Sequence, residues 1–241
     1  MYKYEIAKRI EIIAPLTNQE EWDCSGWGVD AEGRDEIKKV MLCLTVTNDV
    51  VKQAKEQNCD MIVSHHPCFY IPVEWSDINI YSAHTNLDKA QGGTTDTLIA
   101  NLKYPPDPQR PKAAINWRSE NNSFLRFVTY DSPVSLSYFT EIIRQISPNA
   151  RFINNQNKTE IKTVAFCAGS GSEFINEAKI LGADCFVTGD LKFHTALESP
   201  IMVFDIGHFE SEILVLSVFK QIIGDEVEYI YAKENSPFIQ I

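Results

Sequence analysis

Residues 40–67 read VMLCLTVTNDVVKQAKEQNCDMIVSHHP, and this stretch decides the fold. Residues 40–46 and 60–64 are short apolar runs typical of strands. Residues 50–57 between them are expected to form a helix, which Asn48 is placed to cap. A strand, a short helix and a second strand in close succession predict a βαβ unit, whose two strands pair in parallel.

A second βαβ unit follows at a constant offset. Its expected strand, helix and strand are residues 163–168, 172–181 and 184–188. When the numbering is shifted by 124, residues 40–88 align with residues 164–212 without a gap and share nine identities in 49 positions. The shift superposes a His-x-x-x-Asp segment on a His-x-x-x-Glu segment. Self-similarity at so long an offset predicts two related halves.

The remaining apolar patterns complete an α/β protein. Further strands are expected at residues 78–83, 123–129, 201–205 and 226–232, and further helices at residues 4–16, 94–102, 135–146 and 208–223. The proline-rich stretch Tyr104-Pro105-Pro106-Asp107-Pro108 is the best candidate for a linker. We expect two related α/β halves, residues 1–104 with the C-terminal segment packing back on them and residues 105–241. Each half should hold a mixed or parallel sheet flanked by helices, with a metal site in the cleft between the halves.

The composition narrows the class of protein. The formal net charge of −11 argues against a nucleic-acid-binding surface, which needs clustered Lys and Arg. The N-terminus does not resemble a signal peptide, and no apolar run approaches the roughly 18 residues of a membrane span. The six cysteines are isolated from one another, which fits reduced thiols. We therefore expect a cytoplasmic protein that does not bind a membrane.

The five histidines share one position in the pattern. All lie in the short segments that follow expected strands: His65, His66, His84, His194 and His208. In doubly wound sheets, ligands bind outside the carboxyl ends of the strands. The histidines are therefore candidates for a common site.

Carboxylates accompany two of these histidines at the same spacing. Asp88 follows His84 by four residues, and Glu212 follows His208 by four residues. Residues at i and i+4 share one face of a helix, and imidazole with carboxylate is a ligand set for divalent metals.

Each of these motifs also has a local interpretation. A His-His pair can be an ordinary pair of loop residues, Asn86 and Asp88 can cap the next helix, and His208 with Glu212 can be a contact on an exposed helix face. Asp190 and His194 are candidates for substrate contacts or for orienting ligand imidazoles, and capping is an equal alternative for Asp190. The segment Gly169-Ser170-Gly171-Ser172 is a weak candidate for an anion cradle.

Four ordered motifs together resemble the Ngg-interacting-factor-three-like family, whose members are often labelled GTP cyclohydrolase I type 2 homologues. The motifs are Ser64-His65-His66-Pro67, His84-Thr85-Asn86-Leu87-Asp88, Thr188-Gly189-Asp190 with His194, and Gly207-His208 with Ser211-Glu212. The chain resembles the short form of the family, which lacks an additional domain between the halves. It departs from the family pattern at Thr45, where an aspartate is usual, and at Cys24, where an asparagine is usual.

The resemblance implies a two-domain α/β fold, a dinuclear metal site and a toroidal homohexamer built as a trimer of dimers. Carried onto this sequence, the metal ligands are His65, His66, Asp88, His208 and Glu212. The two divalent ions could be Zn, Mn, Fe or Ni, because ligand type alone does not choose among them.

Two functions are compatible with such a site. The first is a metal-dependent hydrolase of a nucleotide or other phosphorylated small molecule, in which His84 or His194 acts as general acid or base. The second is a non-enzymatic metal-handling or regulatory hexamer. A DNA-binding regulator is disfavoured by the net charge.

Overall fold

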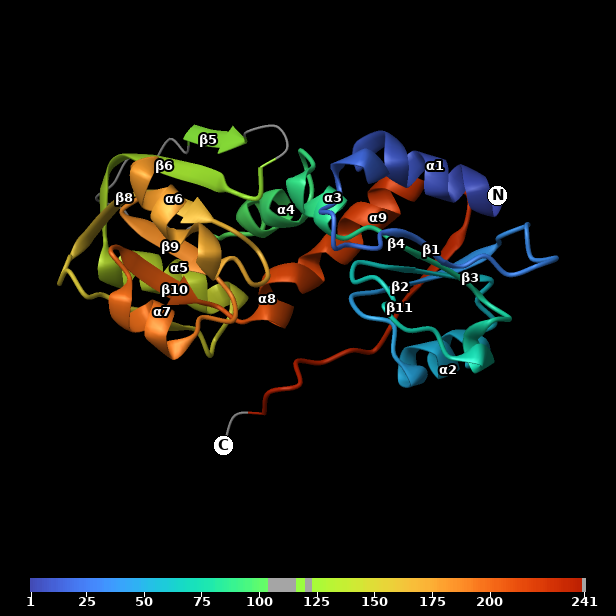
Figure 1. The fold of residues 1–241 in the computed structure, drawn as a ribbon. Helices are drawn as coiled ribbons and strands as arrows, with labels where there is room; N and C mark the ends of the chain where they lie inside the picture. The colour runs from blue at the N-terminus through green and yellow to red at the C-terminus, as the bar shows by residue number, and fades with distance from the viewer. Residues whose placement is uncertain (104–115, 120–122, 240–241) are drawn as a thin grey trace. The chain divides into compact units, whose positions relative to one another are not determined.

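The computed structural model describes residues 1–103, 116–119 and 123–239 (Figure 1). These residues form two compact units: unit 1 is Met1–Gly93 with Val215–Pro237, and unit 2 is the described part of Thr94–Leu214 and of Phe238–Ile241. The proline-rich linker expected around Tyr104 to Pro108 lies outside the described residues. Within the described part of the chain, no helix is long and apolar enough to cross a membrane.

Unit 1 is built on a five-stranded sheet in the order β1-β4-β3-β2-β11. Its strands are β1 (Gly26–Val29), β2 (Lys39–Cys43), β3 (Met61–Ser64), β4 (Asn79–Ser82) and β11 (Glu228–Tyr231). All neighbours pair in parallel except β1, which is antiparallel to β4. Its helices are α1 (Lys3–Ile13), α2 (Asn48–Glu56), α3 (Thr85–Lys89) and α9 (Leu216–Ile223).

The two faces of this sheet are covered by different helices. Helix α2 packs its buried Val50, Val51 and Ala54 on Met41 and Ile62 of the sheet. Helices α1 and α9 contact each other on the opposite face, and α9 contacts β2 (Figure 1). Because both faces are covered, β2, β3 and β4 are almost entirely buried, which explains their continuous apolar sequences.

The start of α2 differs in one detail from the sequence-based expectation. Thr47, not Asn48, caps the helix: its side chain accepts a hydrogen bond from the Val50 amide at 3.2 Å. The Asn48 side chain instead accepts from the indole N–H of Trp75 at 3.0 Å. Thr47 has the extended backbone of a capping residue, whereas Asn48 is already helical.

Unit 2 is built on a six-stranded sheet within the described residues, in the order β5-β6-β8-β9-β10-β7. Its strands are β5 (Asn116–Ser119), β6 (Arg126–Ser135), β7 (Arg151–Ile153), β8 (Glu160–Phe166), β9 (Cys185–Thr188) and β10 (Met202–Asp205). The central three strands β8, β9 and β10 are parallel, and the other pairings are antiparallel. Its helices are α4 (Thr94–Ala100), α5 (Leu136–Ile146), α6 (Ile175–Ile180), α7 (Phe193–Glu198) and α8 (His208–Glu212).

The duplication that the sequence predicted is visible in the strand register. Val40 pairs with Met61 in unit 1, and the residues 124 positions later, Val164 and Cys185, pair in unit 2. Asp60 and Asp184, another aligned pair, each accept two backbone N–H groups with one carboxylate oxygen. The two units therefore share a βαβ core whose turns are closed by the same hydrogen bonds.

The next strand departs from the repeat by one residue. Asn79 of β4 faces Met61, and the constant offset would place Val203 opposite Cys185. Met202 takes that place instead. The segment between the end of β10 and His208 is therefore one residue longer than the segment between the end of β4 and His84. Gly207 accommodates the additional residue with a positive φ of 84°.

Several short elements were not expected from the sequence. Strands β1 and β7 pair antiparallel with β4 and β10, and helices α3 and α7 have only five and six residues. The helix expected over residues 208–223 is interrupted by a 3₁₀ turn at Ile213–Val215, where unit 2 gives way to unit 1. The core topology was thus predicted better than the edges of the sheets.

Candidate metal centre

Three histidines gather at the carboxyl edge of the unit 1 sheet. His65 and His66 follow β3, and His84 follows the adjacent parallel strand β4. The ring centroids of the three imidazoles lie 5.1, 5.2 and 5.5 Å from one another. Each ring offers a nitrogen within 4.8 Å of a nitrogen of the other two, which is compact enough for a shared cation.

The tight exit of the chain from β3 brings the adjacent His65 and His66 rings together. The amides of His65 and His66 donate to the carbonyls of Cys43 and Leu44 at 3.2 and 2.8 Å, and Ser64 Oγ donates to the His66 carbonyl at 2.9 Å. His65 is fully buried, and His66 is half-buried. The interpretation of this pair as ordinary loop residues does not fit a ring with no solvent exposure.

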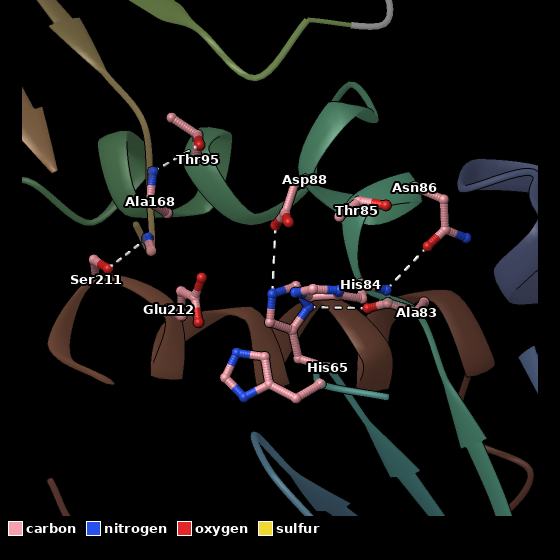
Figure 2. A network of polar contacts seen from close by, with 12 residues as sticks. His65, Ala83, His84, Thr85, Asn86, Asp88, Thr95, Ala168, Ser211 and Glu212 are labelled. Carbon is pink, nitrogen blue, oxygen red and sulfur yellow. Dashed lines mark hydrogen bonds and ion pairs between the residues drawn. The ribbon is translucent and has the colours of Figure 1, made fainter. Parts of the chain in front are cut away.

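The His65 ring has a defined orientation. Its Nδ1 lies 2.9 Å from the Ala83 carbonyl oxygen, which can only accept, so Nδ1 carries the proton (Figure 2). Its Nε2 therefore presents a lone pair, and this atom lies 3.4 Å from Oδ1 of Asp88. That separation is too long for a good hydrogen bond. Two ligand atoms that each lie about 2.1 Å from one ion at a tetrahedral angle are about 3.4 Å apart, so the pair fits a metal ion.

The position of Asp88 agrees with a ligand role. It lies inside α3, and its side chain is only 14% exposed. The neighbouring Asn86 takes a structural role. Its Oδ1 accepts from the His84 amide at 2.9 Å (Figure 2), and its Nδ2 donates to the Ala14 carbonyl at 2.7 Å.

In the other two imidazoles of unit 1, Nδ1 likewise lies close to an oxygen atom of a neighbouring side chain. Nδ1 of His66 lies 2.7 Å from Oγ1 of Thr45, and Nδ1 of His84 lies 3.2 Å from Oδ1 of Asp23. Ligand histidines characteristically use one ring nitrogen for such an oxygen partner and the other for the metal.

Asp23 is a further candidate site residue, which the sequence-based list of metal ligands and acid–base groups did not include. Its side chain is fully buried, and it accepts hydrogen bonds from His84, Thr85 and Ser25. Burial alone would raise the pKa of this carboxyl, but the hydrogen bonds from His84, Thr85 and Ser25 outweigh it and hold the pKa well below its usual range. The signal was present in Trp22-Asp23-Cys24-Ser25-Gly26, yet nothing local connects that segment to a histidine 61 residues away.

Unit 2 carries the second group of candidate ligands. His208 is the first residue of α8, and its Nε2 lies 2.9 Å from Oε2 of the buried Glu212 one turn later. Its Nδ1 lies 2.7 Å from Oδ2 of Asp190. Burial opposes protonation of His208, but Glu212 and Asp190 on either side of the ring outweigh it and raise its pKa to about 9. The two carboxylates therefore favour the protonated imidazolium of His208 in the metal-free protein.

A glycine makes room for the Glu212 carboxylate. Gly169 has a positive φ of 67°, and a Cβ added there would overlap Oε1 of Glu212 and lie 3.1 Å from its Cδ. The hypothesis of an anion cradle at this segment is wrong for both glycines. The Gly169 amide donates to Ser211 Oγ at 2.9 Å, and the Gly171 amide donates to Thr188 Oγ1 at 2.8 Å.

The remaining predicted residue is placed differently. His194 lies on α7 and is exposed, with its ring 5.3 Å from that of Phe193. In unit 1 the structure thus brings His65 together with His66, His84 and Asp88. In unit 2 it brings His208 together with Glu212 and Asp190.

These features define an α/β protein whose two sheets carry groups of imidazoles and carboxylates suited to divalent metal ions. The family assignment rests on nearly the whole length of the chain. The family described as Duf34/NIF3 (NGG1p interacting factor 3) matches residues 1–237, so the chain belongs to this family. The resemblance inferred from the four motifs is confirmed.

Individual relatives agree with this assignment. The chain is 32% identical to the GTP cyclohydrolase 1 type 2 homolog of Clostridium perfringens, over 97% of each chain. It is 27% identical to NGG1-interacting factor 3 of Saccharomyces cerevisiae, over 73% of this chain and 70% of that protein. A Bacillus cereus protein related to NIF3 has the same fold, with a TM-score of 0.84 at 18% identity over 100% of this chain and 99% of that one.

Proposed function

We propose that this protein binds two divalent metal ions through His65, His66, Asp88, His208 and Glu212, and that it hydrolyses a nucleotide or other phosphorylated small molecule. The proposal combines the candidate ligands of unit 1 (His65, His66 and Asp88) with those of unit 2 (His208 and Glu212). It draws on the internal alignment, in which the two His-x-x-x-carboxylate segments occupy equivalent positions.

One observation carries the proposal. Four histidines, His65, His66, His84 and His208, each direct Nδ1 to an oxygen atom. The opposite nitrogen is therefore the one available to a metal, and in His65 and His208 it faces a carboxylate. A surface histidine has no physical reason to repeat this arrangement, whereas a metal ligand does.

The residues suit hydrolysis in the following way. When bound, a pair of divalent ions lowers the pKa of a water molecule and polarises a phosphate or carbonyl group. His84 is the stronger candidate for general acid or base, because Asp23 orients its ring beside His65 and His66. His194 stays a candidate that would need substrate to reach the exposed surface of α7.

Elemental analysis of protein purified without chelators tests the metal proposal, and a hydrolysis screen of nucleotides and sugar phosphates tests the reaction. We expect about two ions per chain and turnover that is lost with His84→Gln. Two ions without turnover on any substrate would favour the metal-handling alternative. Absence of bound metal in the native protein would refute both.

We also propose that the chain forms a homohexamer. Exposed aromatic residues support this, because aromatic side chains are enriched at protein interfaces. They include Trp22, Phe69, Tyr70, Phe193 and Phe238. Light scattering should give a mass near six times 27.4 kDa at micromolar concentration, and a single species at the monomer mass would exclude the hexamer.

A further inference from the structure

The segment that follows β11 is fixed along the edge of β2. The Ala232 amide donates to the Leu42 carbonyl at 2.9 Å, which extends the ladder one residue past β11. Gln53 of α2 then binds both backbone groups of Lys233, accepting from its amide at 2.9 Å and donating to its carbonyl at 3.3 Å. The strand extension through Ala232 leads directly to Glu234, whose own contacts within unit 1 are made by its carboxylate.

The Glu234 carboxylate binds two consecutive backbone amides. Oε2 accepts from the Leu44 amide at 2.7 Å, and Oε1 accepts from the Thr45 amide at 3.0 Å. The side chain is half-buried, and burial raises the pKa of its carboxyl despite these two hydrogen bonds. Burying a carboxylate there costs desolvation free energy. The two hydrogen bonds that it accepts stabilise the turn at Leu44 and Thr45.

The same two residues of this turn hold His66. The His66 amide donates to the Leu44 carbonyl at 2.8 Å, and its ring nitrogen Nδ1 lies 2.7 Å from the Thr45 hydroxyl. Glu234 thus binds the N–H groups of Leu44 and Thr45, and His66 binds a carbonyl and a hydroxyl of the same pair. The chain of contacts joins residues 168 positions apart (234 − 66).

We propose that Glu234 is a positioning residue for the His66 imidazole. By fixing the Leu44–Thr45 turn, it keeps the Thr45 hydroxyl opposite Nδ1 and leaves Nε2 as the nitrogen that can bind a metal. The inference rests on the proposed function in one respect, namely that His66 is a metal ligand. It assigns a role to the segment after β11, which none of the four sequence motifs includes.

The physical argument concerns the neutral imidazole, which exists as two tautomers. In the tautomer whose Nδ1 carries the proton and donates a hydrogen bond to Thr45 Oγ1, the lone pair is on Nε2. If the turn relaxes, the hydroxyl moves away from Nδ1, and both ring rotation and the alternative tautomer become accessible. Partners of this kind around a metal site typically contribute about 10- to 100-fold to metal affinity.

A set of variants separates positioning from general stability. Glu234→Ala removes the carboxylate, Thr45→Val removes the hydroxyl, and Thr45→Ser keeps it. Gln53→Ala is the matched control, because it releases Lys233 of the same segment without touching the turn at Leu44 and Thr45. Two measurements apply to each variant: the Zn²⁺ dissociation constant by competition with a chromophoric chelator, and the ¹⁵N shifts of His66 in metal-free protein labelled at histidine.

We expect Glu234→Ala and Thr45→Val each to weaken Zn²⁺ binding about tenfold and to shift the His66 nitrogens toward a tautomer mixture. Thr45→Ser and Gln53→Ala should resemble the wild type in both measurements. Because Glu234 acts through Thr45, the double variant should bind Zn²⁺ no more weakly than Thr45→Val alone.

Three results would overturn the proposal: wild-type affinity and shifts in Glu234→Ala, an equal loss in Gln53→Ala, or additive losses in the double variant. Failure of the proposed function is distinguishable from these. If the wild type does not bind Zn²⁺, metal binding by His66 is refuted, while the ¹⁵N shifts of the metal-free variants still decide whether Glu234 sets the state of the ring.

Discussion

Replacing Gly169 by alanine should weaken metal binding far more than it weakens the fold. The new Cβ would overlap Oε1 of Glu212, so the carboxylate must move by on the order of 1 Å to reach normal van der Waals separation. The Glu212 side chain can make that movement by changing rotamer, but it then loses its 2.9 Å contact with Nε2 of His208. The cost to folding is mainly the strain of a non-glycine residue at φ 67°, about 1–2 kcal/mol.

Gly182→Ala is the matched control for this variant. Gly182 also has a positive φ, 93°, but a Cβ there meets nothing within 4 Å. Both variants should therefore lose similar stability in urea denaturation. Only Gly169→Ala should bind Zn²⁺ about 10- to 100-fold more weakly, as expected when a group that holds a metal site is displaced.

A second measurement on Gly169→Ala does not depend on metal. Moving Glu212 away should lower the pKa of His208 from about 9 toward its ordinary value of 6.5, which NMR titration of the metal-free protein would detect. If Gly169→Ala and Gly182→Ala bind Zn²⁺ equally well and His208 titrates as in the wild type, the reasoning about Gly169 is wrong.

Three further predictions address ligands, pH and the core. Glu212→Ala should remove nearly all bound metal and Asp88→Ala only part of it, because a glutamate one turn from His208 has the reach to bridge two ions; equal retention by elemental analysis would count against bridging. The folded pKa of His208, about 9, lies above its ordinary 6.5, so its contribution to the stability of the metal-free protein is fully present below pH 6.5 and lost as pH rises through 9. Thermal denaturation of the metal-free protein between pH 6.5 and 9 should show this loss of stability, and the loss should be smaller in Asp190→Asn. Identical dependence of stability on pH in the wild type and the variant would show that Asp190 does not contribute to the raised pKa of His208. In the unit 2 core, Asp96→Ala should destabilise the protein by about 3–5 kcal/mol, because it leaves the Arg126 guanidinium buried without its carboxylate 2.6 Å away. Denaturant unfolding measures this, and a loss below about 1 kcal/mol would contradict it.

The βαβ cores were predictable because their information is local. The apolar runs at β2, β3 and β9 are buried on both faces, so their sequences are continuous rather than alternating, as is the last part of β8 over residues 164–166. The offset of 124 was readable for the same reason, since Asp60 and Asp184 close equivalent turns.

The edges of the sheets were less predictable. Strand β1 reads Gly26-Trp27-Gly28-Val29, a poor strand sequence that persists because β4 supplies its antiparallel partner. Helix α3 has five residues, too few to produce a periodic apolar pattern. Such segments adopt their structure from their neighbours, so tertiary packing overrides their propensity.

The amino-acid sequence by itself determined the α/β class, the duplicated cores and the identity of the candidate ligands, because strand patterns and His-x-x-x-carboxylate spacing are properties of contiguous residues. Only the tertiary structure decided which nitrogen of each imidazole is available. That depends on Ala83, Thr45, Asp23 and Asp190, which lie 18, 21, 61 and 18 residues from their histidines. The place of Gly169 next to Glu212 and the contact of Glu234 with the Thr45 amide likewise depend on residues that are far apart in the sequence. Hydrogen bonds and close contacts act over a few ångströms in space, and no spacing along the chain reveals which distant residues the fold will bring within that range.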